Sequence, residues 1–164
     1  MPESESGRGE CIICKLLDGS EPASFVYRDD DCSAFMDIQP INAGHMLVAP
    51  NNHVPLMDNL PADAAAHLMR IAHMLAAALR ESGLPCAGVN MFLADGEAAG
   101  QEVFHVHLHL FPRYHGDGFG LRFGPDYFKR ERAELDEAAG RIRQALVRTT
   151  QKQSAPNEAQ GDAR

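Results

Sequence analysis

Three histidines alternate with apolar residues in the stretch His105-Val106-His107-Leu108-His109. Successive side chains of an extended strand point to opposite faces, so this spacing predicts one face of imidazoles and one apolar face. An ordinary solvent-facing strand would carry Lys, Thr, Glu or Ser instead. The row therefore indicates chemistry, and imidazoles in such a row serve either as metal ligands or as covalent catalysts.

The metal interpretation places a catalytic zinc on His105, His107 and His109. Neighbouring side chains on one strand face lie about 6.7 Å apart and the outer pair about 13 Å apart, whereas a Zn–N bond is about 2.0–2.1 Å long. That geometry disfavours a zinc shared by all three rings and leaves the interpretation as an alternative. In the covalent interpretation, the central His107 attacks phosphorus as a neutral imidazole, and its neighbours stabilise charge on the phosphoryl oxygens.

Two cysteines, Cys11 and Cys14, form a Cys-x-x-Cys pair near the N-terminus. Such a pair supplies half of a tetrahedral zinc site, and a reduced metal-free pair or a redox motif are the alternatives. The remaining cysteines, Cys32 and Cys86, are predicted to be ordinary buried thiols. Three of the other histidines, His67, His73 and His115, are predicted to be surface residues.

The elements that would position these residues follow from hydrophobic periodicity. Alternating runs predict strands, and apolar residues at helical spacing predict two helices, with Asn59 as the cap of the first. Strands grouped in hairpins with few helices indicate an α+β fold with a mainly antiparallel five-stranded sheet, one long helix after the third strand and a C-terminal helix. The expected strands are 24–28, 32–37, 45–49, 88–93 and 103–111, and the expected helices are 62–82 and 131–147.

Composition limits the class of protein. The 164 residues are 45% hydrophobic and 23% charged, which suits one globular domain, expected over 11–148 between disordered tails at 1–10 and 149–164. A formal net charge of −8 argues against a nucleic-acid partner held by its phosphates, but it allows a small phosphorylated ligand. With no apolar run of membrane-spanning length and no visible signal peptide, we expect a cytoplasmic protein without a membrane partner.

Several motifs in the same order along the chain resemble the histidine triad (HIT) superfamily, and in particular bacterial HIT-domain proteins of the Hint/Fhit-like hydrolase group. The resemblance covers about 11–113 and rests on five stretches, 11–15, 34–40, 44–50, 94–104 and the histidine row at 105–110. It implies a HIT-like α+β fold. It also implies an enzyme, a nucleotide hydrolase or transferase that cleaves adenylated substrates at the α-phosphate through a covalent nucleotidyl-histidine intermediate. Nucleoside phosphoramidates, acyl-adenylates and dinucleoside polyphosphates are the substrate classes that it suggests.

Site roles are carried over from the resemblance onto matching positions. His107 would be the nucleophile, with His109 on the phosphate oxygens, His45 in a proton relay behind it, and Gln101 with the backbone of Gly100 holding phosphate or water. The implied nucleotide pocket consists of Asp37 at the ribose hydroxyls and Phe35 and Ile38 at the base. The residues themselves also allow Asp37 to cap a hairpin turn and Phe35 simply to pack in the core.

The resemblance further implies a structural zinc held by Cys11, Cys14, His53 and His105, and a homodimer to which apolar residues such as Met69 and Met74 could contribute. Ala94 and Glu102 depart from the family pattern near the phosphates, which puts the choice of substrate in question. Two alternative functions remain beside the enzyme: a non-catalytic nucleotide-binding module with a structural zinc, and a hydrolase whose catalyst is zinc on the histidine row.

Overall fold

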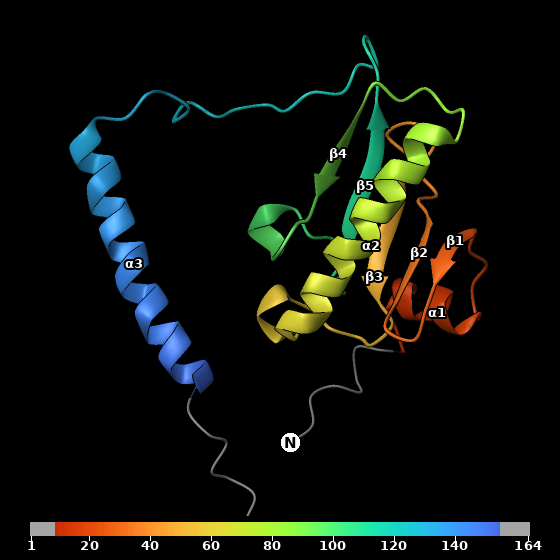
Figure 1. The fold of residues 1–164 in the computed structure, drawn as a ribbon, viewed down its shortest axis with the longest axis horizontal. Helices are drawn as coiled ribbons and strands as arrows, with labels where there is room; N and C mark the ends of the chain where they lie inside the picture. The colour runs from red at the N-terminus through yellow and green to blue at the C-terminus, as the bar shows by residue number, and fades with distance from the viewer. Residues whose placement is uncertain (1–8, 155–164) are drawn as a thin grey trace, which may run out of the picture. The chain divides into compact units, whose positions relative to one another are not determined.

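The computed structural model describes residues 9–154 and contains a five-stranded antiparallel sheet in the order β1-β2-β3-β5-β4 (Figure 1). The α+β fold class and the antiparallel sheet predicted from the sequence are thus confirmed. The strands are β1 Phe25–Arg28, β2 Cys32–Met36, β3 Met46–Pro50, β4 Gly88–Phe92 and β5 Leu108–Arg113. The helices are α1 Ile12–Asp18, α2 Ala62–Glu81 and α3 Arg132–Ser154, with short 3-10 turns η1 Met57–Asn59 and η2 Glu97–Ala99.

The sheet has two buried faces because residues alternate across it. Side chains such as Ala34, Val48 and Leu110 form one core with α2, which crosses that face of the sheet in Figure 1. The intervening residues, among them Phe35 and Ala49, form a second core on the other face with Cys11, Ile13 and Cys14 at the N-terminal end of the chain. Each strand therefore shows one set of side chains to α2 and the other to the face on which the histidines lie.

The long helix α2 runs over Ala62–Glu81, close to the expected 62–82, but the predicted cap is wrong. Asn59 ends the 3-10 turn η1, and Pro61 is the residue that precedes the helix. Proline has no N–H to leave unsatisfied, and it disfavours helical conformation in the residue before it, so the helix begins directly after Pro61. Gly83, with a left-handed φ of 81°, follows its last turn.

Four strands agree with the predicted bounds to within one residue, but β5 begins at Leu108 and not at 103. Pro50, the last residue of β3, has no N–H for the ladder, and the last paired residues of the two strands are Val48 and Leu108. His105 and His107 consequently lie in an irregular segment before the strand. The predicted strand start is therefore wrong, but the predicted division of faces is confirmed, because Val106 packs in the core with α2 whereas His105 contacts Cys11 and Cys14 of the second core.

The single domain expected over 11–148 is divided in the structure into two compact units, with the boundary between Phe119 and Gly120. The connecting stretch is rich in glycine, at 116, 118, 120 and 124, which disfavours regular structure. The second unit contains α3, which continues to Ser154, so the tail expected from 149 begins later than predicted. The helix ends two residues before Pro156, and a proline disfavours helical conformation in the residue before it. The rest of the predicted tails, 1–8 and 155–164, lie outside the described residues.

Within residues 9–154, no helix is both long enough and apolar enough to cross a bilayer.

Candidate active site

A continuous row of side chains crosses the sheet on the face opposite α2. The strand register pairs Phe25 with Phe35, Phe35 with Leu47, Leu47 with His109, and His109 with Phe92. Directly opposed residues in an antiparallel sheet point to the same face. His109 is therefore aligned with the aromatic residue Phe35 two strands away, although 74 residues of chain separate them.

His107 is buried, and one of its two ring nitrogens is already hydrogen-bonded to the backbone. Its Nδ1 lies 2.6 Å from the backbone carbonyl oxygen of His105, which can only accept a hydrogen bond, so Nδ1 carries the proton. The neutral imidazole then has its lone pair on Nε2. His107 also lines an open cleft on the site face. In its neutral form, a ring held in this tautomer presents the Nε2 lone pair that a histidine nucleophile requires.

His45 and His109 form a pair whose tautomers also follow from their partners. The backbone N–H of Ile41 donates to His45 Nδ1 at 3.1 Å, so His45 carries its proton on Nε2. That Nε2 lies 2.9 Å from His109 Nδ1, which must accept, and His109 is left with a proton on Nε2. The ring of His109 lies 4.9 Å from that of His107, centroid to centroid. A hydrogen-bonded chain thus runs from a backbone amide through two imidazoles toward His107.

Asp37, His45 and His109 are close enough to hold a metal ion, because their donor atoms lie within 4.8 Å of one another. The hydrogen bond between His45 and His109 argues against it. A metal ion needs a lone pair from each nitrogen, whereas the His45 Nε2 proton occupies the space between the two rings. Burial lowers the pKa of His45, partly opposed by Asp37. Burial, together with His107 and His45, lowers the pKa of His109 to about 4, so both rings are neutral at pH 7.

Asp37 follows β2, and its turn-capping role is confirmed, whereas its contact with ribose stays a prediction. One carboxylate oxygen accepts from the backbone N–H of Gln39 at 2.8 Å, which is the turn-capping contact. The other lies 3.6 Å from His45 Nε2 and 3.9 Å from His109 Nδ1. Asp37 also lines the cleft, so its second oxygen is available on the same side as the imidazoles.

The cleft has a volume of about 540 Å³, within the usual range for small-ligand sites. Phe35 is buried in its wall, and Ile38, whose side chain is exposed, lies at its edge. Helix α1 supplies a second apolar wall, Ile12, Ile13 and Leu16, which the sequence analysis missed. Ile12 and Ile13 lie between the two cysteines and Leu16 lies two residues after them, a segment too short for its period to be recognised in the sequence.

Gln101 and Gly100 lie in the loop before the histidine segment. Gln101 is buried, its side-chain oxygen accepts from Gly96 N–H, and its nitrogen donates to the carbonyls of Pro55 and Val103. Gly100 has a φ of 84°, which favours glycine. The residues lining the cleft include neither Gly100 nor Gln101, so their contact with phosphate stays a prediction. At the departures from the family pattern, Ala94 is buried and Glu102 is exposed.

Cys11, Cys14, His53 and His105 converge at the other end of the histidine segment. The Sγ atoms of both cysteines lie 3.6 Å from His105 Nδ1, and Cys14 Sγ lies 3.4 Å from His53 Nδ1. A tetrahedron with Zn–S and Zn–N bonds of ordinary length has S···N edges of about 3.5 Å. His105 Nε2 donates to the Pro50 carbonyl at 2.9 Å, which leaves the Nδ1 lone pair toward the sulfurs. These four residues fit a zinc ion.

Two other predictions about single residues need correction. His67 is not a plain surface residue, because its Nε2 donates to Asp29 at 2.7 Å and ties the turn after β1 to α2. Cys86 is only half-buried, because it lies in the connection between α2 and β4 rather than in an element, whereas Cys32 is fully buried as expected. Burial, assisted by Asp29, raises the pKa of the Cys32 thiol to about 12, which suits an inert side chain.

An antiparallel α+β fold in which three alternating histidines lie between a Cys/His cluster and an open cleft defines a histidine-triad class of protein. The family model for the HIT domain matches residues 18–116, and the chain belongs to this family.

Comparison with known proteins supports the same assignment. A HIT-like protein of Methanocaldococcus jannaschii is 38% identical over 133 residues, which is 81% of this chain and 98% of the relative. The adenylylsulfatase HINT3 of Arabidopsis thaliana is 28% identical over 140 residues, 85% of this chain and 69% of that protein.

Solved structures agree. A Zn-bound histidine triad family protein from Mycobacterium smegmatis aligns with a TM-score of 0.67 and 38% identity, covering 73% of this chain and 86% of that one. A histidine triad nucleotide-binding protein from Candida albicans aligns with a TM-score of 0.73 and 27% identity, covering 85% and 99%.

Proposed function

We propose that this protein is a nucleotide hydrolase or nucleotidyltransferase that cleaves adenylated compounds at the α-phosphate through a covalent intermediate on His107. The observation that carries the proposal is the hydrogen bond from His107 Nδ1 to the His105 carbonyl, because it leaves the Nε2 lone pair free beside the cleft. A module that only bound nucleotides would have no need of a histidine held in this tautomer.

The reaction has two steps. In the first, His107 Nε2 donates its lone pair to the α-phosphorus, an N–P bond forms, and the bond from phosphorus to the leaving group breaks with its electrons going to that group. His109 donates its Nε2 proton in a hydrogen bond to a phosphoryl oxygen as negative charge develops there. In the second, a water oxygen attacks phosphorus, the N–P bond breaks with its electrons returning to Nε2, and the nucleoside monophosphate leaves with the water oxygen and one of its protons. The other water proton balances the proton that the leaving group takes up, and His107 is neutral again.

The cleft supports a nucleotide as the ligand. With the phosphate at His107, the carboxylate of Asp37, which follows β2, would accept from the ribose hydroxyls. Phe35, Ile38 and the apolar residues of α1, which also line the cleft, would contact a purine base. Nucleoside phosphoramidates, acyl-adenylates and dinucleoside polyphosphates are candidate substrates, and the adenylylsulfatase relative adds mixed sulfate anhydrides to them.

Zinc has a structural role in this proposal. Cys11, Cys14, His53 and His105 would hold it, and the ion when bound would cross-link the segment around α1 to the residue two before the nucleophile. That link positions the His105 carbonyl, on which the tautomer of His107 depends. The Zn-bound relative from M. smegmatis supports the assignment.

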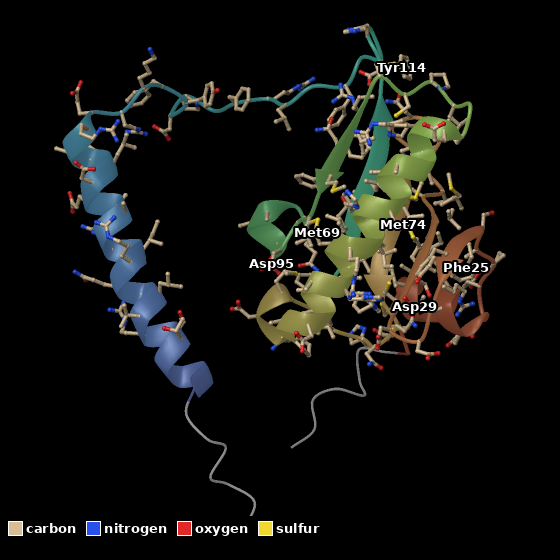
Figure 2. The ribbon with its side chains drawn as sticks, in the orientation of Figure 1. Phe25, Asp29, Met69, Met74, Asp95 and Tyr114 are labelled. Carbon is tan, nitrogen blue, oxygen red and sulfur yellow. The ribbon has the colours of Figure 1, made fainter. Side chains whose placement is uncertain are left out.

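We also propose a cytoplasmic homodimer. Met69 and Met74 are exposed on α2 and labelled in Figure 2, and Met91 and Phe92 are exposed on β4, an edge strand of the sheet. Large apolar side chains grouped on a helix and on an unpaired strand edge are typical of a protein–protein interface.

A rapid-quench experiment in alkaline denaturant tests the enzyme. The protein is mixed with an adenosine phosphoramidate labelled at phosphorus, and we expect the wild-type chain to carry label that survives alkali and is released by acid, and His107→Ala to carry none. His73→Ala, in an exposed histidine of α2, is the matched control and should label normally. Tight AMP binding without turnover in the wild type would indicate the binding module instead. Loss of activity on chelation while the fold and the AMP affinity persist would indicate the catalytic-zinc alternative.

A further inference from the structure

The C-terminal helix α3 carries an apolar stripe with a regular three-and-four spacing. Leu135, Ala139, Ile142, Leu146 and Thr149 follow one another at intervals of four, three, four and three residues. This is the repeat of the a and d positions of a coiled coil, maintained over two heptads. A stripe of this period marks one side of a helix as the seam for another helix.

The stripe is not covered by any residue that the structure describes in the same unit. Leu135 is 43% exposed, Ile142 69% and Leu146 59%, within a unit that begins at Gly120. Helices that are stable by themselves in water are rare, because most of a helix's stability in proteins comes from packing of its apolar face. Helix α3, drawn in blue in Figure 1, therefore needs a partner for its stripe.

The charges of α3 indicate which partner fits. After Arg132 at its start, its first half carries the acidic residues Glu134, Asp136 and Glu137, and its second half carries Arg141, Arg143 and Arg148. Two copies of this helix side by side in parallel would bring the acidic segments together and the basic segments together. Two copies in antiparallel orientation bring the acidic half of each beside the basic half of the other.

We propose that α3 pairs with α3 of a second copy of this chain as an antiparallel two-helix coiled coil. Leu135 of one copy packs against the partner's Leu146, and Ile142 packs against the partner's Ala139. In this register, Asp136, which flanks the seam, lies beside the partner's Arg143, and the two-fold axis repeats the contact at the other end. The ion pair between Glu137 and Arg141 within one helix lies on the outward side and is compatible with the pairing.

This surface is additional to the α2 and β4 surfaces proposed above for the homodimer. Pairing at α3 does not require the nucleotide chemistry of the first unit. It predicts that helix α3 is ordered only in the assembly, and that its stability depends on charges carried by two different copies.

Charge exchange in the full-length protein tests the pairing, with hydrogen exchange of the α3 amides and sedimentation equilibrium as measurements. Asp136→Arg and Arg143→Asp each place like charges at both flanking contacts. In each variant alone, the protection of the α3 amides should fall by about tenfold or more, and self-association should be weaker. An equimolar mixture of the two variants restores opposite charges in every contact. We expect the mixture, like the double variant, to recover wild-type protection.

The mixture distinguishes pairing between two chains from an effect of either charge on its own helix. A charge effect confined to one helix cannot be repaired by a second chain, so protection that mixing does not restore would overturn the pairing. The same holds if the α3 amides exchange freely in the wild type, or if they are protected but insensitive to both charges, because α3 would then pack elsewhere.

Two seam controls complete the design. Ile142→Glu, in the seam, should abolish protection of α3 while leaving the sheet amides unchanged. Gly140→Ala lies off the seam, where an added Cβ would meet only the end of the Arg143 side chain at 4.0 Å, and it should increase helix stability without removing the charge dependence.

Discussion

Protonation of His109 gives a quantitative test of the histidine pair. In the folded protein His109 Nδ1 accepts a hydrogen bond from His45 Nε2–H, and burial, His107 and His45 lower the pKa of His109 from 6.5 to about 4. The unfolded chain binds a proton at about 6.5, so between these two values the unfolded state holds more protons than the folded state. The free energy of unfolding therefore falls as pH drops from 6.5 to 4, and at lower pH this contribution changes no further.

The size of the effect follows from the same two pKa values. At about 1.4 kcal/mol for each pH unit, the gap amounts to about 3 kcal/mol of stability lost between pH 7 and pH 4. His109→Asn removes the titrating group and keeps an oxygen acceptor near the position of Nδ1. We expect the variant to lose about 3 kcal/mol less stability than the wild type over this range.

Urea unfolding at a series of pH values from 7 to 4, followed by circular dichroism, measures the difference. His73→Asn, in an exposed histidine of α2, should follow the wild type. If His109→Asn and the wild type lost stability in parallel as the pH fell, His109 would be protonated in the folded state, and the tautomer assignment for the His45–His109 pair would be wrong.

Other predictions concern the core, the turn after β1, the cysteine cluster and the ribose contact. Leu110→Ala, at a fully buried position between the sheet and α2, should cost about 2–5 kcal/mol of stability in calorimetry. Burial alone would raise the pKa of Asp29, but hydrogen bonds from Cys32 N–H, Tyr27 and His67 hold that pKa below its usual range. Asp29→Asn should therefore be less stable than the wild type at pH 7, and it should lose less stability than the wild type on acidification below pH 4 in urea unfolding. Chelation of zinc, or Cys14→Ser, should lower the melting temperature, whereas Cys86→Ser should not. Asp37→Asn should reduce the preference for AMP over 2′-deoxy-AMP in calorimetric titration by about tenfold.

Much of the site was readable in the sequence because the relevant signals are local. The type and spacing of the histidines pointed to chemistry, and the Cys-x-x-Cys pair pointed to metal. Alternation within each strand was enough to predict four of the five strands to within one residue, because the period of two is a property of the extended chain itself. Helix α1 was missed because its single apolar turn is too short to show a period.

The predictions that failed depended on contacts between distant segments. A regular strand was expected from 103, but the ladder between β3 and β5 stops at Val48 and Leu108, so His105 and His107 precede the strand. Outside the ladder, His105 lies against Cys11 and Cys14, and its carbonyl lies at hydrogen-bonding distance from His107 Nδ1. The distance argument against one shared metal remains valid, and the three rings are divided between two sites.

The residue types alone determined which groups of this protein can bind metal or attack phosphorus, since those capacities belong to the side chains. Which ring nitrogen carries a proton was decided only by the tertiary structure. The backbone carbonyl of His105, the amide of Ile41 and the carbonyl of Pro50 each select one tautomer, and no spacing in the sequence places a particular backbone group at hydrogen-bonding distance from a particular imidazole.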